Sequence, residues 1–356
     1  MRYKFLTLFC LIIALGFYLS PKVSCDLNFD DSEFNLPSFS PAVGFYDKFY
    51  TSKITREFKN VRGMILPHHL IVGDKIADFI TRAFGSKDCS IKKIIVIGPD
   101  HFGMNFSAFS STDQNFSTPF GVLPVDKTEV SSLFREGVVE LNNKAFIREH
   151  SIFSLTAFLK KHFPSARLLP VLTKTNIDDS DVESLFSYLT SYVDESTLII
   201  ASVDFSHYTP YDVALSHDKM AYSAITNVDY ERLMKAETDS NQTLILFLKL
   251  MNNLNSLNIV DYLNTNSMDV VGHNDPSLMT SHQFYTYAEG EPSKPFNFKS
   301  ILFVPDDTSN IAPESLERIL MGNDYLIRPS DLNSDNSFEI EGKVYIVGDV
   351  SKLQFF

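Results

Sequence analysis

The chain has 356 residues, 44% of them hydrophobic, which is enough for one large α/β domain or two smaller ones. Its formal net charge of −13 at pH 7 argues against a nucleic-acid partner, because phosphates would repel the chain and no basic patch offsets this. The three cysteines, Cys10, Cys25 and Cys89, are too few for a disulfide framework or a thiolate metal cage.

Residues 1–25 have the pattern of an export signal. Arg2 and Lys4 precede an apolar stretch from Phe5 to Leu19, and Pro21 follows it. The stretch is shorter than the roughly 20 residues of a membrane-spanning helix, which favours cleavage over anchoring. Acylation of Cys25 is an alternative. We predict an exported protein that contacts a membrane only through this segment.

The next segments open an α/β domain. Residues 26–62 have no regular period and are predicted to wrap the domain, which we place at residues 63–305. Residues 64–66 form its first strand, residues 70–84 a helix that ends at Gly85, and residues 94–97 the next strand. This order predicts a right-handed parallel crossover.

Strands and helices continue to alternate along the rest of the domain. The predicted strands are residues 121–125, 168–172, 198–201 and 296–304, the last closing the core, and the predicted helices are residues 128–134, 180–192, 211–226, 229–236 and 244–254, with another opening at 149–151. The fold class is therefore α/β, with a mostly parallel central sheet covered by helices on both faces. Residues 306–356 are predicted to be a loosely attached C-terminal extension.

Histidines and acids follow several of the predicted strands. His68 comes after the first strand, His101 after the second, and Asp204 and His207 after the strand at 198–201. Ligands bind at the carboxyl ends of strands in open α/β sheets, so these side chains are predicted to converge on a metal or acid–base site. Each also has a structural interpretation, such as satisfying backbone amides at a turn.

Glu149 and His150 open a predicted helix and have two interpretations. An acid at a helix start stabilises the helix dipole, so Glu149 could simply cap this helix. Both side chains could instead line the pocket and take part in catalysis.

With these motifs in place, the chain resembles the Memo family, which includes the proteins called AmmeMemoRadiSam system protein B. The motifs that carry the resemblance occur in order between residues 64 and 304: Pro67–His68, Gly98–His101, Thr118–Gly121 followed by Val125–Asp126, Glu149–Ile152, Pro170–Leu172, Ser202–Tyr208 and the loop at Gly272. The resemblance implies a fold like the class III extradiol dioxygenases, whose iron is held by two histidines and a carboxylate.

Carried over by motif, the resemblance makes His68 and His101 metal ligands and places Asp204 and His207 in the same pocket. Two imidazoles and one anionic ligand leave open positions on Fe(II) or a similar divalent metal. A nearby unligated histidine could then move protons. The implied function is a metal-dependent oxidoreductase acting on a small substrate.

The chain departs from the family pattern before Gly272, where that pattern has a cysteine and this chain has Val271. A valine cannot bind a metal, so the third ligand is predicted to be His273, with Asp275 or a water as alternatives. Val271 also favours a second hypothesis, a non-catalytic module that binds a peptide or small ligand in a degenerate cleft. A third is a partner subunit of a radical enzyme, which the export signal disfavours.

Overall fold

The computed structural model describes residues 35–296 except 52 and 274, and then residues 301–304, 306, 309, 313–320, 323, 325–334, 337–340 and 343–346. The predicted export signal therefore lies outside the described residues. Within them, no helix combines the length and apolar character needed to cross a membrane.

Cys89 is disulfide-bonded.

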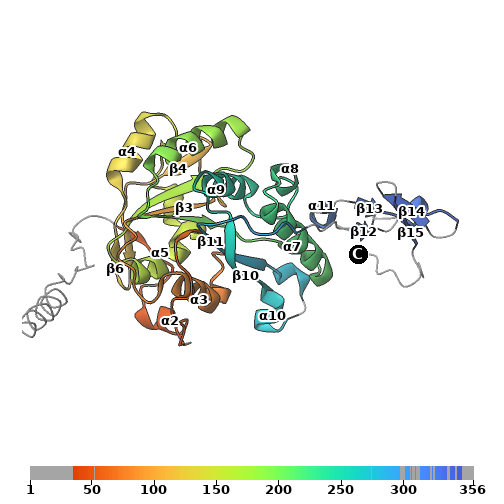
Figure 1. Ribbon diagram of the computed structural model, residues 1–356, viewed down its shortest axis with the longest axis horizontal. Coiled ribbons are helices and arrows are strands. Elements are labelled where there is room, and N and C mark those ends of the chain that lie inside the picture. The colour runs from red at the N-terminus through yellow and green to blue at the C-terminus, as the bar shows by residue number, and fades with distance from the viewer. Residues whose placement is uncertain are drawn as a thin grey trace, which may run out of the picture.

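An eight-stranded sheet forms the centre of the domain, in the order β10-β11-β2-β9-β3-β8-β4-β7 (Figure 1). Its middle consists of four parallel strands, β2 (Val61–Leu66), β9 (Thr197–Ser202), β3 (Lys93–Pro99) and β8 (Arg167–Thr173). Apart from Lys93 and Arg167 at two strand starts, their residues are buried. Continuous apolar strands of this kind need cover on both faces, as predicted.

Helices cover both faces of this sheet. The helix α3 (Gly73–Phe84) packs with α5 (His150–His162) on one face. The helix α9 (Asn241–Asn253) lies against β9 and β3 on the other, where α6 (Asp179–Tyr192) packs on it (Figure 1). The predicted end of α3 is confirmed, because Gly85 follows it with a φ of 78°. The fold is thus α/β with a largely parallel sheet between helical layers.

The last strand of the main sheet is not the predicted one. The strand β11 (Ser281–Ala288) pairs antiparallel with β2 and with β10 (Asn258–Asn266), and both were missed by the sequence analysis. Inside the predicted strand 296–304, β12 (Ile301–Phe303) pairs with β13 (Tyr325–Ile327) in a separate sheet. The sequence did not predict β11 because this strand carries His282, Gln283 and other polar residues and so has no apolar run, although all of its residues are buried.

The remaining elements are short or peripheral. They are β1 (Leu36–Pro37), β4 (Phe109–Ser111), β5 (Phe116–Thr118), β6 (Gly121–Leu123), β7 (Glu140–Leu141), β14 (Ser337–Ile340), β15 (Lys343–Ile346), α2 (Val43–Asp47), α4 (Lys127–Arg135), α7 (Tyr211–Thr226), α8 (Tyr230–Leu233), α10 (Ser267–Val271), α11 (Pro313–Leu320) and the 3-10 turns η1 (Leu70–Val72), η2 (Ala145–Ile147), η3 (Pro276–Leu278) and η4 (Pro329–Asp331). Leu36 and Tyr46 are fully buried, so the segment before β2 packs into the core. Leu302 and Val304 cluster with Val213 of α7. The predicted domain boundaries stay predictions.

The buried histidine of α5 makes the stability of the fold depend on pH. His162 contacts the carbonyl oxygen of Gly85 through Nδ1 at 2.8 Å and the hydroxyl of Tyr50 through Nε2 at 3.1 Å. A carbonyl only accepts, so Nδ1 carries the proton. Burial lowers the pKa of His162 from 6.5 to about 4. At a pH between these two pKa values, His162 therefore binds a proton in the unfolded chain but not in the folded chain.

We expect the contribution of neutral His162 to the free energy of unfolding to be present above pH 6.5 and to be lost as the pH falls toward 4. Between pH 7 and 4.5 the loss amounts to about 2.5 kcal/mol. Urea unfolding of the parent and of His162→Gln at both pH values measures it, since the variant lacks the titrating ring. Equal losses in the two proteins would contradict the account.

Candidate metal centre

The predicted site residues lie where the parallel strands end. His68 follows β2, His101 follows β3 and Asp204 follows β9, and all three line one cavity of about 440 Å³. The other residues around this cavity are His150, His207, Tyr208, Glu237, Thr238 and Asp239. A neighbouring cavity of about 590 Å³ shares five of these residues and extends to Phe39, Phe45 and Lys48. The sheet topology has thus brought distant histidines and acids together.

Hydrogen bonds orient the imidazole of His68. The Ser202 hydroxyl donates to the backbone carbonyl of Ser151 at 2.5 Å, and it lies 3.2 Å from His68 Nδ1. A hydroxyl has one hydrogen, so it must accept from Nδ1, which is therefore protonated. The lone pair of neutral His68 then resides on Nε2. This ring is buried, with 2% of its surface exposed.

Glu149 orients His101 in the same sense. Its side chain is fully buried, and it accepts from His101 Nδ1 at 2.7 Å and from the backbone N–H of His101 at 2.9 Å. It also caps α5 by accepting from the N–H of Ser151. Glu149 therefore both caps the helix and lines the site, the two roles that the sequence left open. Neutral His101 likewise presents its lone pair on Nε2.

Asp239 brings a carboxylate to both imidazoles. Its Oδ2 lies 3.2 Å from His68 Nε2 and 3.6 Å from His101 Nε2. Two backbone contacts with Asp204 fix it: Asp239 Oδ2 accepts from the N–H of Asp204 at 3.0 Å, and its own N–H donates to the carbonyl of Asp204 at 3.1 Å. It precedes Ser240, the N-cap of α9, where the helix dipole favours a negative charge.

The electrostatics of this group are those of cation-binding residues. Burial lowers the pKa of His101, but contacts with Asp239 and Glu149 outweigh it and raise that pKa to about 10. Burial opposes protonation of His68 too, yet Asp204 and Asp239 raise its pKa. Burial would raise the pKa of Asp239, but the two imidazoles hold it well below its usual range. The site retains positive charge as protons, which a metal cation can replace.

His150 lies against the same group. Its ring stacks on His101 with centroids 4.1 Å apart, and burial lowers its pKa to about 4. Nitrogens of His68, His101 and His150 lie within 4.8 Å of one another, as do donor atoms of His68, Asp204 and Asp239. A third group consists of His69, Asp204 and His282. The chain therefore contains histidine and aspartate groups that could bind a metal ion.

The predicted third ligand does not join these groups. Neither His273 nor Asp275 belongs to any group of potential metal ligands among the described residues. His273 Nδ1 instead accepts from the N–H of Asp275 at 3.3 Å, and Val271 is 58% exposed. The described residues therefore do not bring His273 or Asp275 together with His68 and His101, and a ligand role for His273 stays a prediction. The sequence did not predict Asp239 as a ligand, because this residue follows no strand and its position is typical of a helix cap.

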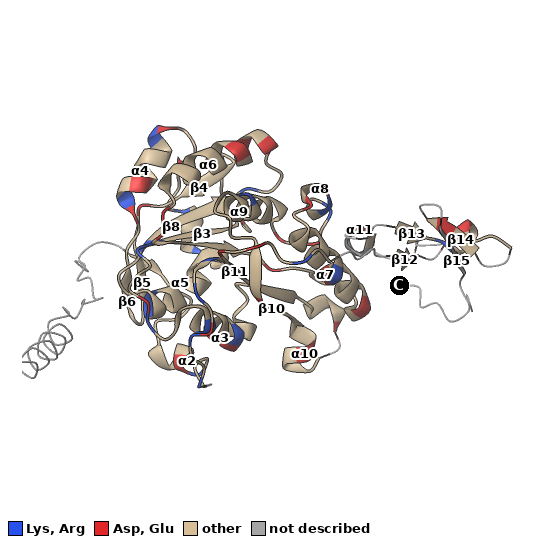
Figure 2. Cartoon of the chain, in the orientation of Figure 1, with Lys and Arg blue, Asp and Glu red and all other residues tan. Residues whose placement is uncertain are grey.

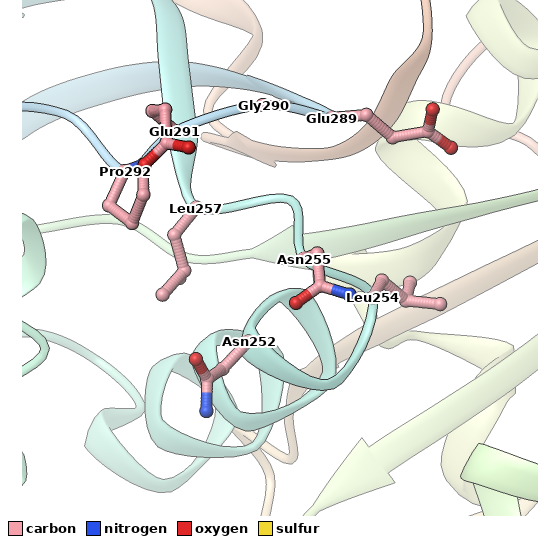
Figure 3. Close-up of a pocket in the computed structure, with 8 residues that line it drawn as sticks. All are labelled: Asn252, Leu254, Asn255, Leu257, Glu289, Gly290, Glu291 and Pro292. Carbon is pink, nitrogen blue, oxygen red and sulfur yellow. The ribbon is translucent and has the colours of Figure 1, made fainter.

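A separate cavity lies elsewhere. It has a volume of about 750 Å³ and is lined by Asn252, Leu254, Asn255, Leu257 and residues 289–292 (Figure 3). The N–H of Glu289 donates to the carbonyl of Asn60, which precedes β2. This cavity therefore lies at the amino end of β2, opposite to the end that carries His68. It contains no histidine, cysteine or serine, so we assign no chemistry to it.

The backbone at Gly98 packs closely against Ser151 of α5, and this packing keeps the site in place. A Cβ on this glycine would lie 2.8 Å from Ser151 Oγ and 2.9 Å from Ser151 Cβ. We expect Gly98→Ala to push α5 outward, to cost about 1–3 kcal/mol of unfolding free energy, and to disturb the contact from Ser202 to His68. Thermal unfolding measures this against Gly44→Ala, where a Cβ would meet nothing within 4 Å. Equal stability of both variants would refute it.

The donor set fits a metal ion. Two imidazoles present Nε2, one carboxylate faces both, and Asp239 Oδ1 is buried with no hydrogen-bond partner in the described part of the protein. Each imidazole also has an outer hydrogen-bond partner, as metal-ligating histidines usually do. The fold and this site define an α/β protein with a candidate metal centre at the carboxyl edge of its sheet.

Comparison with known proteins gives the family. A family model described as "Memo-like protein" matches residues 44–282, about two thirds of the chain. The chain belongs to this family, as the ordered motifs indicated.

Individual relatives match over shorter stretches. A "MEMO1 family protein" of Sulfurisphaera tokodaii is 28% identical over 163 residues, 44% of this chain and 57% of that protein. One of Caldivirga maquilingensis is 33% identical over 146 residues, 39% of this chain and 51% of that protein. The chain thus spans little more than half the length of these relatives. The solved structure of uncharacterized protein JW3007 from Escherichia coli K12 aligns with a TM-score of 0.39 at 14% identity, covering 63% of this chain and 99% of that chain.

Proposed function

We propose that this protein is a metal-dependent oxidoreductase acting on a small substrate, with Fe(II) held by His68, His101 and Asp239. The observation that carries the proposal is the position of Asp239 Oδ2, within 3.6 Å of both Nε2 atoms. Two histidines and one carboxylate are the ligand set of many non-haem iron oxygenases. The family resemblance to class III extradiol dioxygenases favours the same chemistry.

In this proposal the residues around the metal ligands handle protons. Iron would supply open positions for oxygen and for the substrate. His150 lines the cavity and stacks on His101, so its imidazole is placed to accept a proton from a substrate hydroxyl. His207 lines both cavities and can carry a proton between them. Asp204 holds the backbone of His68 through its Oδ1 at 3.2 Å.

The second cavity is the proposed substrate site. Its walls include Phe39, Phe45 and Tyr208, which suit a planar apolar group. Lys48 lies over the Phe45 ring at 4.2 Å from its centroid and offers a positive charge to an anionic substituent. A cavity of about 590 Å³ has the size of typical small-molecule sites. A small aromatic acid meets these conditions.

We also propose that the protein is exported. The sequence pattern of residues 1–25 supports this. A nucleic-acid partner is not proposed. Figure 2 shows lysines and arginines mixed with acidic residues over the domain rather than gathered on one patch.

Oxygen consumption tests the function. The protein is loaded anaerobically with Fe(II) and mixed with a panel of catechols and small aromatic acids, and oxygen uptake and ring-opened products are followed. We expect turnover in the parent and none in Asp239→Asn. Ligand binding that is equal with and without iron, and no oxygen uptake, would instead support the alternative of a non-catalytic module that holds a small ligand or peptide in this cleft.

A further inference from the structure

A second group of metal-binding side chains lies beside the first. His69 Nδ1 and His282 Nε2 are 3.1 Å apart, and donor atoms of His69, His282 and Asp204 all lie within 4.8 Å of one another. His282 is fully buried and Asp204 is 3% exposed. The group uses two histidines that play no part in the proposed iron site.

The sheet explains why these residues meet. His69 comes directly after His68 beyond the end of β2, and His282 is the second residue of β11. The two strands pair antiparallel, with Tyr285 opposite Ile65. Continuing this register past the end of β2 brings His282 beside the pair of histidines. Asp204 enters from β9, the other neighbour of β2.

The burial of this group and the spacing of its donor atoms both favour a bound cation. Burying two histidines and a carboxylate together is costly unless they are neutralised. Donors about 2.1 Å from a common ion stand roughly 3–3.5 Å apart, which the observed 3.1 Å matches.

We propose that His69, His282 and Asp204 bind a second divalent transition-metal ion, and that Asp204 bridges the two metal sites. Asp204 suits this role because its Oδ2 lies 3.5 Å from His68 Nε2 of the first site. Carboxylate-linked ions commonly lie about 3.5–4 Å apart. Imidazole ligands favour zinc, iron, copper or nickel over magnesium or calcium. His69 lines the cavity of about 590 Å³, which gives the ion a route from solvent.

Metal counting tests the second site without reference to catalysis. The full chain is stripped of metal, titrated anaerobically with Co²⁺, desalted and analysed for cobalt per chain. We expect two ions in the parent, one in His69→Gln and one in Asp239→Asn. His273→Gln is the control that should keep two, because it changes a histidine outside both groups. His69 is only partly buried, so this variant is expected to fold even if His282→Gln does not.

The outcomes separate this inference from the proposed function. One ion in the parent that persists in His69→Gln but disappears in Asp239→Asn would overturn the second site and leave the first intact. One ion that disappears in His69→Gln but persists in Asp239→Asn would support the second site and contradict the first. No bound ion in the parent would overturn both.

Discussion

Asp239→Asn is expected to weaken Fe(II) binding by more than about 100-fold. Loss of an outer partner of a metal ligand already costs about 10–100-fold, and this change removes a charged ligand itself. The substitution keeps the shape of the side chain, and an amide oxygen can still accept from the N–H of Asp204. The fold should therefore survive, and competition with a chelator of known affinity measures the loss.

The matched control for Asp239 is Asp275→Asn. Asp275 was a candidate ligand from the sequence, but it lies in the exposed loop after Gly272, where it caps a short turn. We expect its replacement to leave Fe(II) affinity unchanged. If Asp275→Asn weakened the binding and Asp239→Asn did not, the third ligand would lie in that loop after all.

Glu149→Gln is expected to lower metal affinity by about 10–100-fold without removing any ligand. The present carboxylate accepts from His101 Nδ1 and so leaves the lone pair on Nε2. A glutamine amide can donate to Nδ1 instead, which would favour the other tautomer and put a proton on Nε2. Without the negative charge, the pKa of His101 in the metal-free protein should also fall from about 10. Histidine NMR titration detects this shift.

A second effect of Glu149→Gln is the loss of a charged helix cap, which costs about 1 kcal/mol. Asp126→Asn separates the two effects, because Asp126 caps α4 by accepting from the N–H of Glu129 and is no member of the metal groups. Both variants should be destabilised, while only Glu149→Gln should lose metal. Unchanged affinity in Glu149→Gln would show that its carboxylate does not control the His101 tautomer.

The parallel core and half of the site were predictable from local sequence. The strands β2, β3, β8 and β9 are continuous apolar runs, so their positions follow from residue type alone, and His68 and His101 follow directly from where two of them end. The strand β11 is different: its buried polar residues find partners across the fold, as when Ser281 donates to Asp218 at 2.6 Å. Such partners are tertiary and leave no mark on a short sequence window.

Asp239 and His282 could not be placed from sequence for the same reason. Asp239 lies in a turn before α9, and only its contacts with Asp204 show that it faces the histidines. His282 belongs to a strand that has no apolar pattern. The resemblance to the Memo family placed a third ligand in the loop at Gly272, where Val271 is 58% exposed. The tautomers of His68 and His101 depend on Ser202 and Glu149, which are distant in sequence.

A crystal structure of the anaerobically Fe(II)-loaded protein, with anomalous diffraction measured at the iron edge, tests the metal centre most directly. We expect an anomalous peak within bonding distance of His68 Nε2, His101 Nε2 and the carboxylate of Asp239. A peak beside His273 and Asp275, or a fully loaded crystal whose iron contacts neither His68 nor His101, would contradict the site described above.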